Sequence, residues 1–208
     1  MKTSLWLSSI LFSIVIFIVS LSYIFLVAGN LNLVVLSQTT ALTGGILIGL
    51  SFVLSSLSYF FDFADSKLKY RKQLGLLGYY FAVAHSLSLI YRFPTTYVEN
   101  FPHWLTQLPN ILGLAAMFIL TYMAIISTEA GMRLSGTYFR PLLRTGYLAY
   151  AFLIIRAYLI EGEMWHQWAW SLDTWPPPRL LLTVFALNVI FWRLAMEVSL
   201  QLKKKPVA

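Results

Sequence analysis

Long apolar stretches alternate with short polar ones along this chain. Six stretches are long enough to cross the ~30 Å hydrocarbon core of a bilayer at a helical rise of about 1.5 Å per residue. They cover approximately residues 4–27, 41–61, 74–91, 110–127, 142–160 and 180–199. The pattern predicts an all-α integral membrane protein in which residues 1–208 form one domain, a bundle of six transmembrane helices.

Composition agrees with this prediction and excludes a water-soluble globule. Hydrophobic residues fill 59% of the 208 positions and charged residues only 11%, against about a quarter in a typical soluble domain. The chain has no Cys, so disulfides, thiolate metal sites and iron–sulfur clusters are excluded. The first apolar stretch is too long for the apolar core of a secretory signal peptide, and we expect it to remain as a span.

The basic residues indicate how the bundle is oriented. Twelve of the 15 Lys and Arg residues fall on one side of the six-span arrangement, whereas only Arg92 and Arg179 fall on the other and Arg156 lies inside a span. Cytoplasmic loops are enriched in Lys and Arg, so both termini are expected to be cytoplasmic. The excess of positive charge therefore reports topology. We expect the lipid bilayer as a partner and no nucleic acid.

The predicted outer loop at residues 161–178 contains four Trp residues and ends in three consecutive Pro. Trp side chains favour the headgroup region of a membrane, which predicts that this loop is an interfacial anchor. The alternative interpretation is a lid or a docking surface on the outer face.

Small residues indicate where the predicted helices approach closely. In the third span, Gly75, Gly78, Ala82 and His85 follow three- and four-residue spacing and share one face of a helix. Such a face usually packs against another helix. The alternative is that Gly78 and Ala82 leave room for a flat cofactor beside His85.

Two ionisable side chains, His85 and Arg156, are predicted to lie deep in spans and at similar depth. Intramembrane ionisable groups are costly and therefore mark candidate functional sites. For His85 the alternatives are a hydrogen bond to a neighbouring helix, haem ligation, and proton or quinol chemistry. For Arg156 they are snorkelling toward Glu161 or Glu163, and pairing with a carboxylate or a haem propionate.

A longer pattern surrounds His85. The segment from Tyr70 to His85, YRKQLGLLGYYFAVAH, resembles the basic start and the histidine-bearing helix of ferric reductase-like transmembrane domains. Further likenesses bring the resemblance to about residues 40–160; they are Thr43-Gly44, Ser127-Thr128, Phe139-Arg-Pro-Leu and Tyr147-Leu-Ala. The resemblance implies b-type haem between histidines of two helices and transmembrane electron transfer. It also implies a membrane or redox partner protein and a place in the bacterial inner membrane.

The later helix departs from the family pattern. That helix normally carries two histidines about 13 residues apart, and the matching positions are Leu143 and Arg156. Neither side chain ligates iron, which leaves haem b held by His85 alone, another axial ligand, or no haem. On this interpretation His85 is the metal ligand, Arg156 binds a propionate or another anion, and Gly78 and Ala82 border the cofactor.

No nucleotide-binding fingerprint occurs in the sequence, and we expect no flavin or nicotinamide domain in this chain. Any electrons must then come from a partner or from quinol. Two functions follow from the resemblance: an electron-transfer subunit that uses b-type haem, or a haem-free structural or assembly subunit of a larger membrane complex. A channel or transporter has the least support, because the two halves of the chain show no evident repeat.

Overall fold

The structure is a computed structural model that describes residues 2–172 and 174–204, with side chains at all of these except 2, 3, 139–141 and 204. The described residues contain six helices that are long and apolar enough to cross a membrane. They are α1 (Lys2–Ala28), α2 (Leu33–Phe60), α3 (Arg71–Arg92), α5 (Leu108–Ile126), α8 (Gly146–Ser171) and α9 (Pro178–Lys204). The prediction of an all-α six-span bundle is confirmed.

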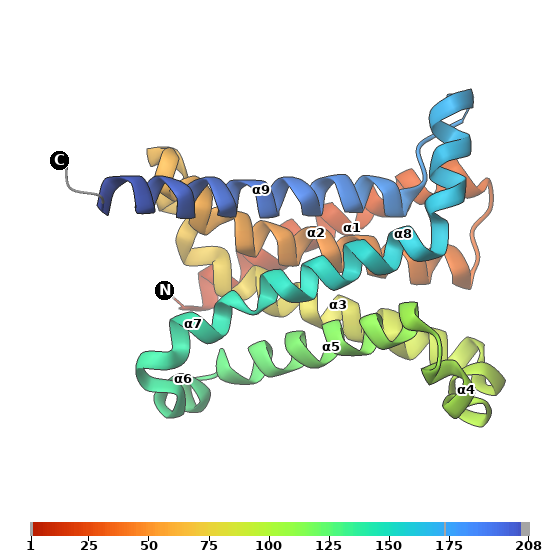
Figure 1. Cartoon of the computed structure of the whole chain (residues 1–208), viewed down its shortest axis with the longest axis horizontal. Helices are drawn as coiled ribbons and strands as arrows, with labels where there is room; N and C mark the ends of the chain where they lie inside the picture. The colour runs from red at the N-terminus through yellow and green to blue at the C-terminus, as the bar shows by residue number, and fades with distance from the viewer. Residues whose placement is uncertain (1, 173, 205–208) are drawn as a thin grey trace.

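Short helical segments connect the spans. They are η1 (Asp62–Tyr70), η2 (Thr95–Glu99), α4 (Phe101–Leu105), α6 (Glu129–Ser135), η3 (Gly136–Tyr138) and α7 (Phe139–Arg144). Figure 1 shows the start of α1, the end of α9, α6 and α7 at one end of the bundle and α4 at the other. We call these the inner end and the outer end. An inner end that faces the cytoplasm would match the distribution of basic residues.

Two spans are longer than hydropathy predicts. Helix α2 begins at Leu33, because the Asn32 side chain accepts hydrogen bonds from the backbone N–H groups of Val34 and Val35 at 2.9 and 3.0 Å. This is a regular N-terminal cap. The polar residues 37–40 in the first turns hide that start from a hydropathy window.

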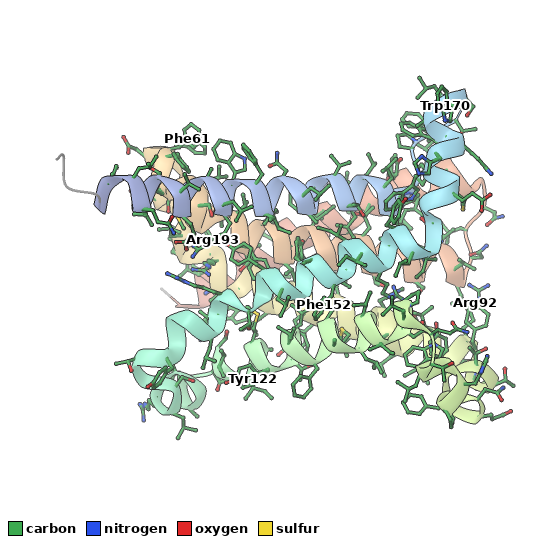
Figure 2. All side chains as sticks on the ribbon, viewed as in Figure 1. Phe61, Arg92, Tyr122, Phe152, Trp170 and Arg193 are labelled. Atoms are coloured by element: carbon green, nitrogen blue, oxygen red, sulfur yellow. The ribbon has the colours of Figure 1, made fainter. Side chains whose placement is uncertain are left out.

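Helix α8 extends into the predicted outer loop and ends at Ser171, before Leu172, whose φ of 53° is left-handed. The loop interpretation was therefore wrong for residues 161–171, because a polar, Trp-rich sequence can remain helical. Figure 1 shows this last part of α8 bent away from the long axis of the bundle. Figure 2 shows Trp170, 89% exposed, near the tip of that segment. A helix in this orientation suits a membrane interface.

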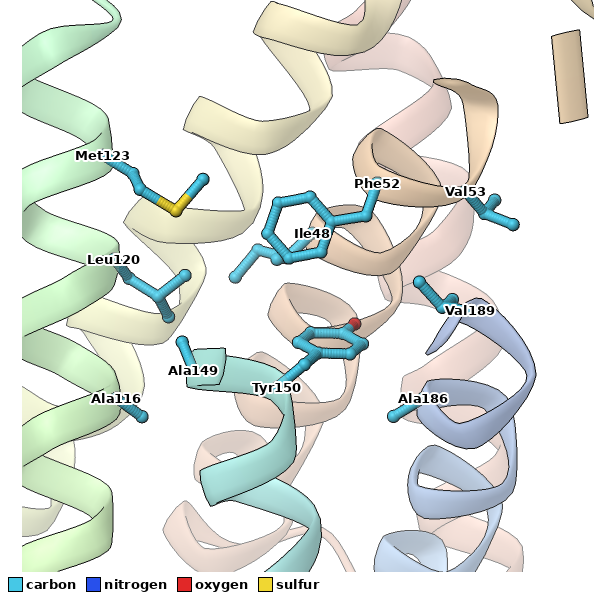
Figure 3. Packing of buried hydrophobic residues seen from close by; sticks show 10 residues of the cluster. All are labelled: Ile48, Phe52, Val53, Ala116, Leu120, Met123, Ala149, Tyr150, Ala186 and Val189. Carbon is cyan, nitrogen blue, oxygen red and sulfur yellow. The ribbon is translucent and has the colours of Figure 1, made fainter. Parts of the chain in front are cut away.

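Helix α2 is the centre of the bundle and packs against α1, α3 and α9. The largest cluster of buried apolar side chains joins α2 to α5, α8 and α9 (Figure 3). Tyr150 of α8 lies in this cluster, 1% exposed, and its hydroxyl donates to the Gly45 carbonyl of α2. The middle of the bundle is thus filled by side chains of these four helices.

Candidate functional site

His85 of α3 is tied to α2 by its ring nitrogen Nδ1. This atom lies 2.9 Å from the Ser37 carbonyl oxygen and 3.0 Å from the Ser37 hydroxyl. Since a carbonyl oxygen only accepts, the contact assigns the proton to Nδ1 and leaves the lone pair on Nε2. Ser88 joins the cluster, because its hydroxyl donates to the His85 carbonyl and lies 2.6 Å from the Ser37 hydroxyl. The hydrogen bond to a neighbouring helix, one of the alternatives for His85, is present.

The small residues of α3 determine how closely this helix approaches α2. A Cβ added at Gly78 would lie 2.8 Å from the Ile48 backbone nitrogen and 2.9 Å from the Gly44 carbonyl oxygen. A Cβ on Gly44 would in turn lie 3.1 Å from the Ala82 backbone nitrogen. In this structure the space beside Gly78 and Ala82 is therefore occupied by the backbone of α2. These two residues bring His85 within hydrogen-bonding distance of Ser37.

Arg156 of α8 turns toward α5. Its Nε donates to the Pro109 carbonyl oxygen at 3.0 Å, and its side chain packs over Gly113, where an added Cβ would lie 2.8 Å from Nε. Glu161, a carboxylate expected to attract Arg156, instead pairs with Arg179 at 2.6 Å. Among the described residues Arg156 has no ion pair. The partner of Arg156 is a backbone carbonyl. The two alternatives drawn from the sequence, snorkelling toward a glutamate and pairing with a carboxylate or propionate, did not include this contact.

The other position that the resemblance matches to a family haem ligand, Leu143, is apolar. Leu143, at the end of α7 just before α8, is partly buried and packs against the main core cluster. The two remaining histidines, His103 and His166, are exposed near the outer end. In the part of the chain that the structure describes, no three His, Asp or Glu side chains come together in a way that could hold a metal ion. His85 is thus not part of a metal-ligating cluster among the described residues.

Comparison with known families identifies the bundle. The family model described as ferric reductase like transmembrane component matches residues 25–154, more than half of the chain. The chain belongs to this family. No curated protein matches the chain. The resemblance drawn from residues 40–160 is confirmed, and the chain is a membrane component of the electron-transfer type that this family forms.

Ferric reductase-like domains typically bind haem, so the residues present can be tested against that group. On the favourable side, a ligand histidine usually donates its other ring N–H to a carbonyl or carboxylate, as His85 does to Ser37. On the other side, Leu143 packs in the core and Arg156 is bonded to α5. The donor set does not fit the bis-histidine haem of the family.

Sequence reasoning missed the partners of both intramembrane groups. Ser37 and Ser88 hold the His85 ring and backbone, and the Pro109 carbonyl holds Arg156. The only available signal was the polar run at residues 37–40 inside an otherwise apolar span. A backbone carbonyl carries no signal, because every residue has one.

Proposed function

We propose that the chain is a haem-free structural or assembly subunit of a larger electron-transfer complex in the membrane. The observation that carries this proposal is what the side chains contact at the two positions matched to the family's haem ligands, one in α7 and one in α8. Leu143 is part of the apolar packing, and Arg156 is bonded to the Pro109 carbonyl. Neither position offers a donor for iron, so a haem relay between α3 and α8 has no ligands on one side.

Packing in the inner half of the bundle supports the same conclusion. Phe52 and Tyr150 are 3% and 1% exposed, and their rings meet edge to face with centroids 5.5 Å apart. The Tyr147 hydroxyl also donates to the Phe52 carbonyl at 3.1 Å. Opening this cluster of buried rings for a macrocycle would require large rearrangement. The residues of α8 here stabilise the bundle.

On this proposal the redox chemistry resides in partner chains, and this bundle holds them in the bilayer. The distribution of basic residues supports a cytoplasmic inner end. We place the bundle in a bacterial inner membrane, as the resemblance drawn from the sequence implies. The partner is a membrane or redox protein, which supplies or receives the electrons.

A second function is favoured by one observation. The contact between His85 Nδ1 and the Ser37 carbonyl leaves Nε2 as the free ring nitrogen, the orientation of a metal-ligating histidine. A single b-type haem on His85 would supply one-electron transfer. In that case Ser37 would orient the imidazole and hold its proton on Nδ1.

Optical spectra distinguish the two functions. The full chain is expressed with a haem supply, purified in mild detergent, and assayed for haem per protein by the pyridine haemochromogen method. We expect a ratio far below one and no reducible Soret band. A ratio near one that is lost in His85→Ala and kept in His103→Ala would replace the first function by the second. His103 is the matched control because it is an exposed histidine of the same chain, and a melting curve for each variant verifies folding.

A further inference from the structure

At the inner end of the bundle two arginines pair with one carboxylate, and a third arginine lies in the same region. The Glu197 atom Oε1 pairs with Arg193 and lies 3.7 Å from Nη1 of Arg144. Arg71, the first residue of α3, is partly buried. Its guanidinium neither donates a hydrogen bond to, nor forms an ion pair with, any residue that the structure describes. The cluster therefore carries a net charge of about +2 at neutral pH.

Two contacts show that Arg71 and Arg193 lie at the same depth in the bundle. The Ser51 hydroxyl donates to the Arg71 carbonyl at 2.8 Å, and the Arg193 guanidinium lies 5.4 Å from the centroid of the Tyr147 ring. The Tyr147 hydroxyl donates at 3.1 Å to the carbonyl of Phe52, the residue after Ser51, so both contacts lie at the same level of α2. Figure 2 shows Arg193 on the side of α9 that faces α8, near the inner end. Arg71 and Arg193 thus share one region.

The depth of this region follows from α2. Ser51 is 18 positions past Leu33, which corresponds to about 27 Å of helix. Since the hydrocarbon core is ~30 Å thick, the arginines lie near its inner boundary, where lipid phosphates begin. Arg144 has a side chain that is 63% exposed, whereas that of Arg193 is 14% exposed. The cluster is therefore accessible from the surface at Arg144 and partly enclosed at Arg193.

Two mutually repelling guanidinium groups near hydrocarbon are costly unless an anion compensates them. The guanidinium fork matches a phosphate group and forms charge-assisted hydrogen bonds with it. Glu197 compensates one of the three charges, and Arg71 has no acceptor in the described chain. A phosphate group would supply both the negative charge and the hydrogen-bond acceptor that Arg71 lacks.

We propose that Arg71, Arg144 and Arg193 form a binding site for a phosphate group, occupied by the headgroup of an anionic phospholipid of the inner leaflet. Basic pockets between transmembrane helices on the cytoplasmic side are suited to such headgroups. The location at the hydrocarbon boundary favours a lipid over free phosphate, because the acyl chains of the lipid remain in the bilayer. This site does not depend on whether the protein binds haem.

The test is a titration of the full chain after delipidation in neutral detergent. Short-chain phosphatidylglycerol, phosphatidylcholine and inorganic phosphate are added separately, and the rise in Tm is measured against concentration. Arg71→Gln is compared with Lys67→Gln, an exposed lysine of η1 that carries the same charge at the same end. Arg144→Gln is the second variant, chosen because this exposed side chain contributes little to folding.

We expect phosphatidylglycerol to bind wild type and Lys67→Gln equally. Its Kd should rise about tenfold in Arg71→Gln, as expected for the loss of one charge-assisted hydrogen bond, and should also rise in Arg144→Gln. Equal Kd values in all four proteins would overturn the site. If inorganic phosphate binds wild type as tightly as phosphatidylglycerol and competes with it, the phosphate site stands and the lipid occupant is wrong.

Discussion

Replacing Gly78 by Ala tests the contact on which the position of His85 depends. The new methyl group would lie 2.7 Å from Ile48 Cγ1, 2.8 Å from the Ile48 backbone nitrogen and 2.9 Å from the Gly44 carbonyl oxygen. Two of these three atoms belong to the α2 backbone, which cannot rotate out of the way as a side chain does. The helices α2 and α3 must separate locally to accommodate one carbon atom.

The magnitude follows from two opposing terms. Overpacking of this kind costs about 1–3 kcal/mol. Replacing Gly by Ala in a helix returns up to about 1 kcal/mol of helix propensity. We expect a net destabilisation of about 1–2 kcal/mol, which lowers Tm by roughly 2–8 °C for a chain of this size.

The matched control is Gly75→Ala, the same substitution one turn earlier in α3. There the new methyl group would meet the Ser51 hydroxyl at 2.9 Å and no backbone atom. This hydroxyl can rotate away at the cost of its hydrogen bond to Arg71, about 1 kcal/mol. Helix propensity offsets that loss, so Gly75→Ala should melt close to wild type.

Thermal melting of the three proteins in the same detergent measures the difference. A Gly78→Ala protein as stable as Gly75→Ala would show that α2 and α3 are not in backbone contact at this point. The amount of haem bound per protein is a second, independent measurement on Gly78→Ala. If Gly78→Ala kept its stability and lost bound haem, Gly78 would line a cofactor, and the packing role assigned to it would be wrong.

Two further predictions concern Arg156 and the orientation of the bundle. Arg156→Leu loses a charged hydrogen bond of about 1.5–3 kcal/mol but also removes an intramembrane charge that costs about 2.5–3.5 kcal/mol, so its Tm should stay close to wild type. Arg156→His should gain no haem by the pyridine haemochromogen assay, since side chain 156 contacts α5; a gain would place it opposite His85. In this chain without Cys, single cysteines at Asn30 or Trp170 should react with an impermeant maleimide added outside intact cells, and those at Lys69 or Leu202 should not. The reverse labelling pattern would invert the topology.

The six spans and the family were predictable from the sequence because each depends on local information. A span is a run of apolar residues of a given length, and the bilayer provides the same solvent along the whole run. The family pattern is equally local, because the segment from Tyr70 to His85 is contiguous. The same resemblance implied that Leu143 and Arg156 stand where the family usually carries haem ligands.

The partners of the intramembrane side chains depended on how the helices are rotated and aligned. His85 meets Ser37 only because Gly78 lets α2 and α3 approach in one particular register. Arg156 turns to the Pro109 carbonyl because α5 packs directly against α8. The hydropathy of an apolar helix is the same whichever way the helix is rotated about its axis. Polar contacts inside a bundle also involve backbone groups, which every residue has and which the sequence therefore does not distinguish. Only the packed bundle therefore decides which polar atoms within it meet.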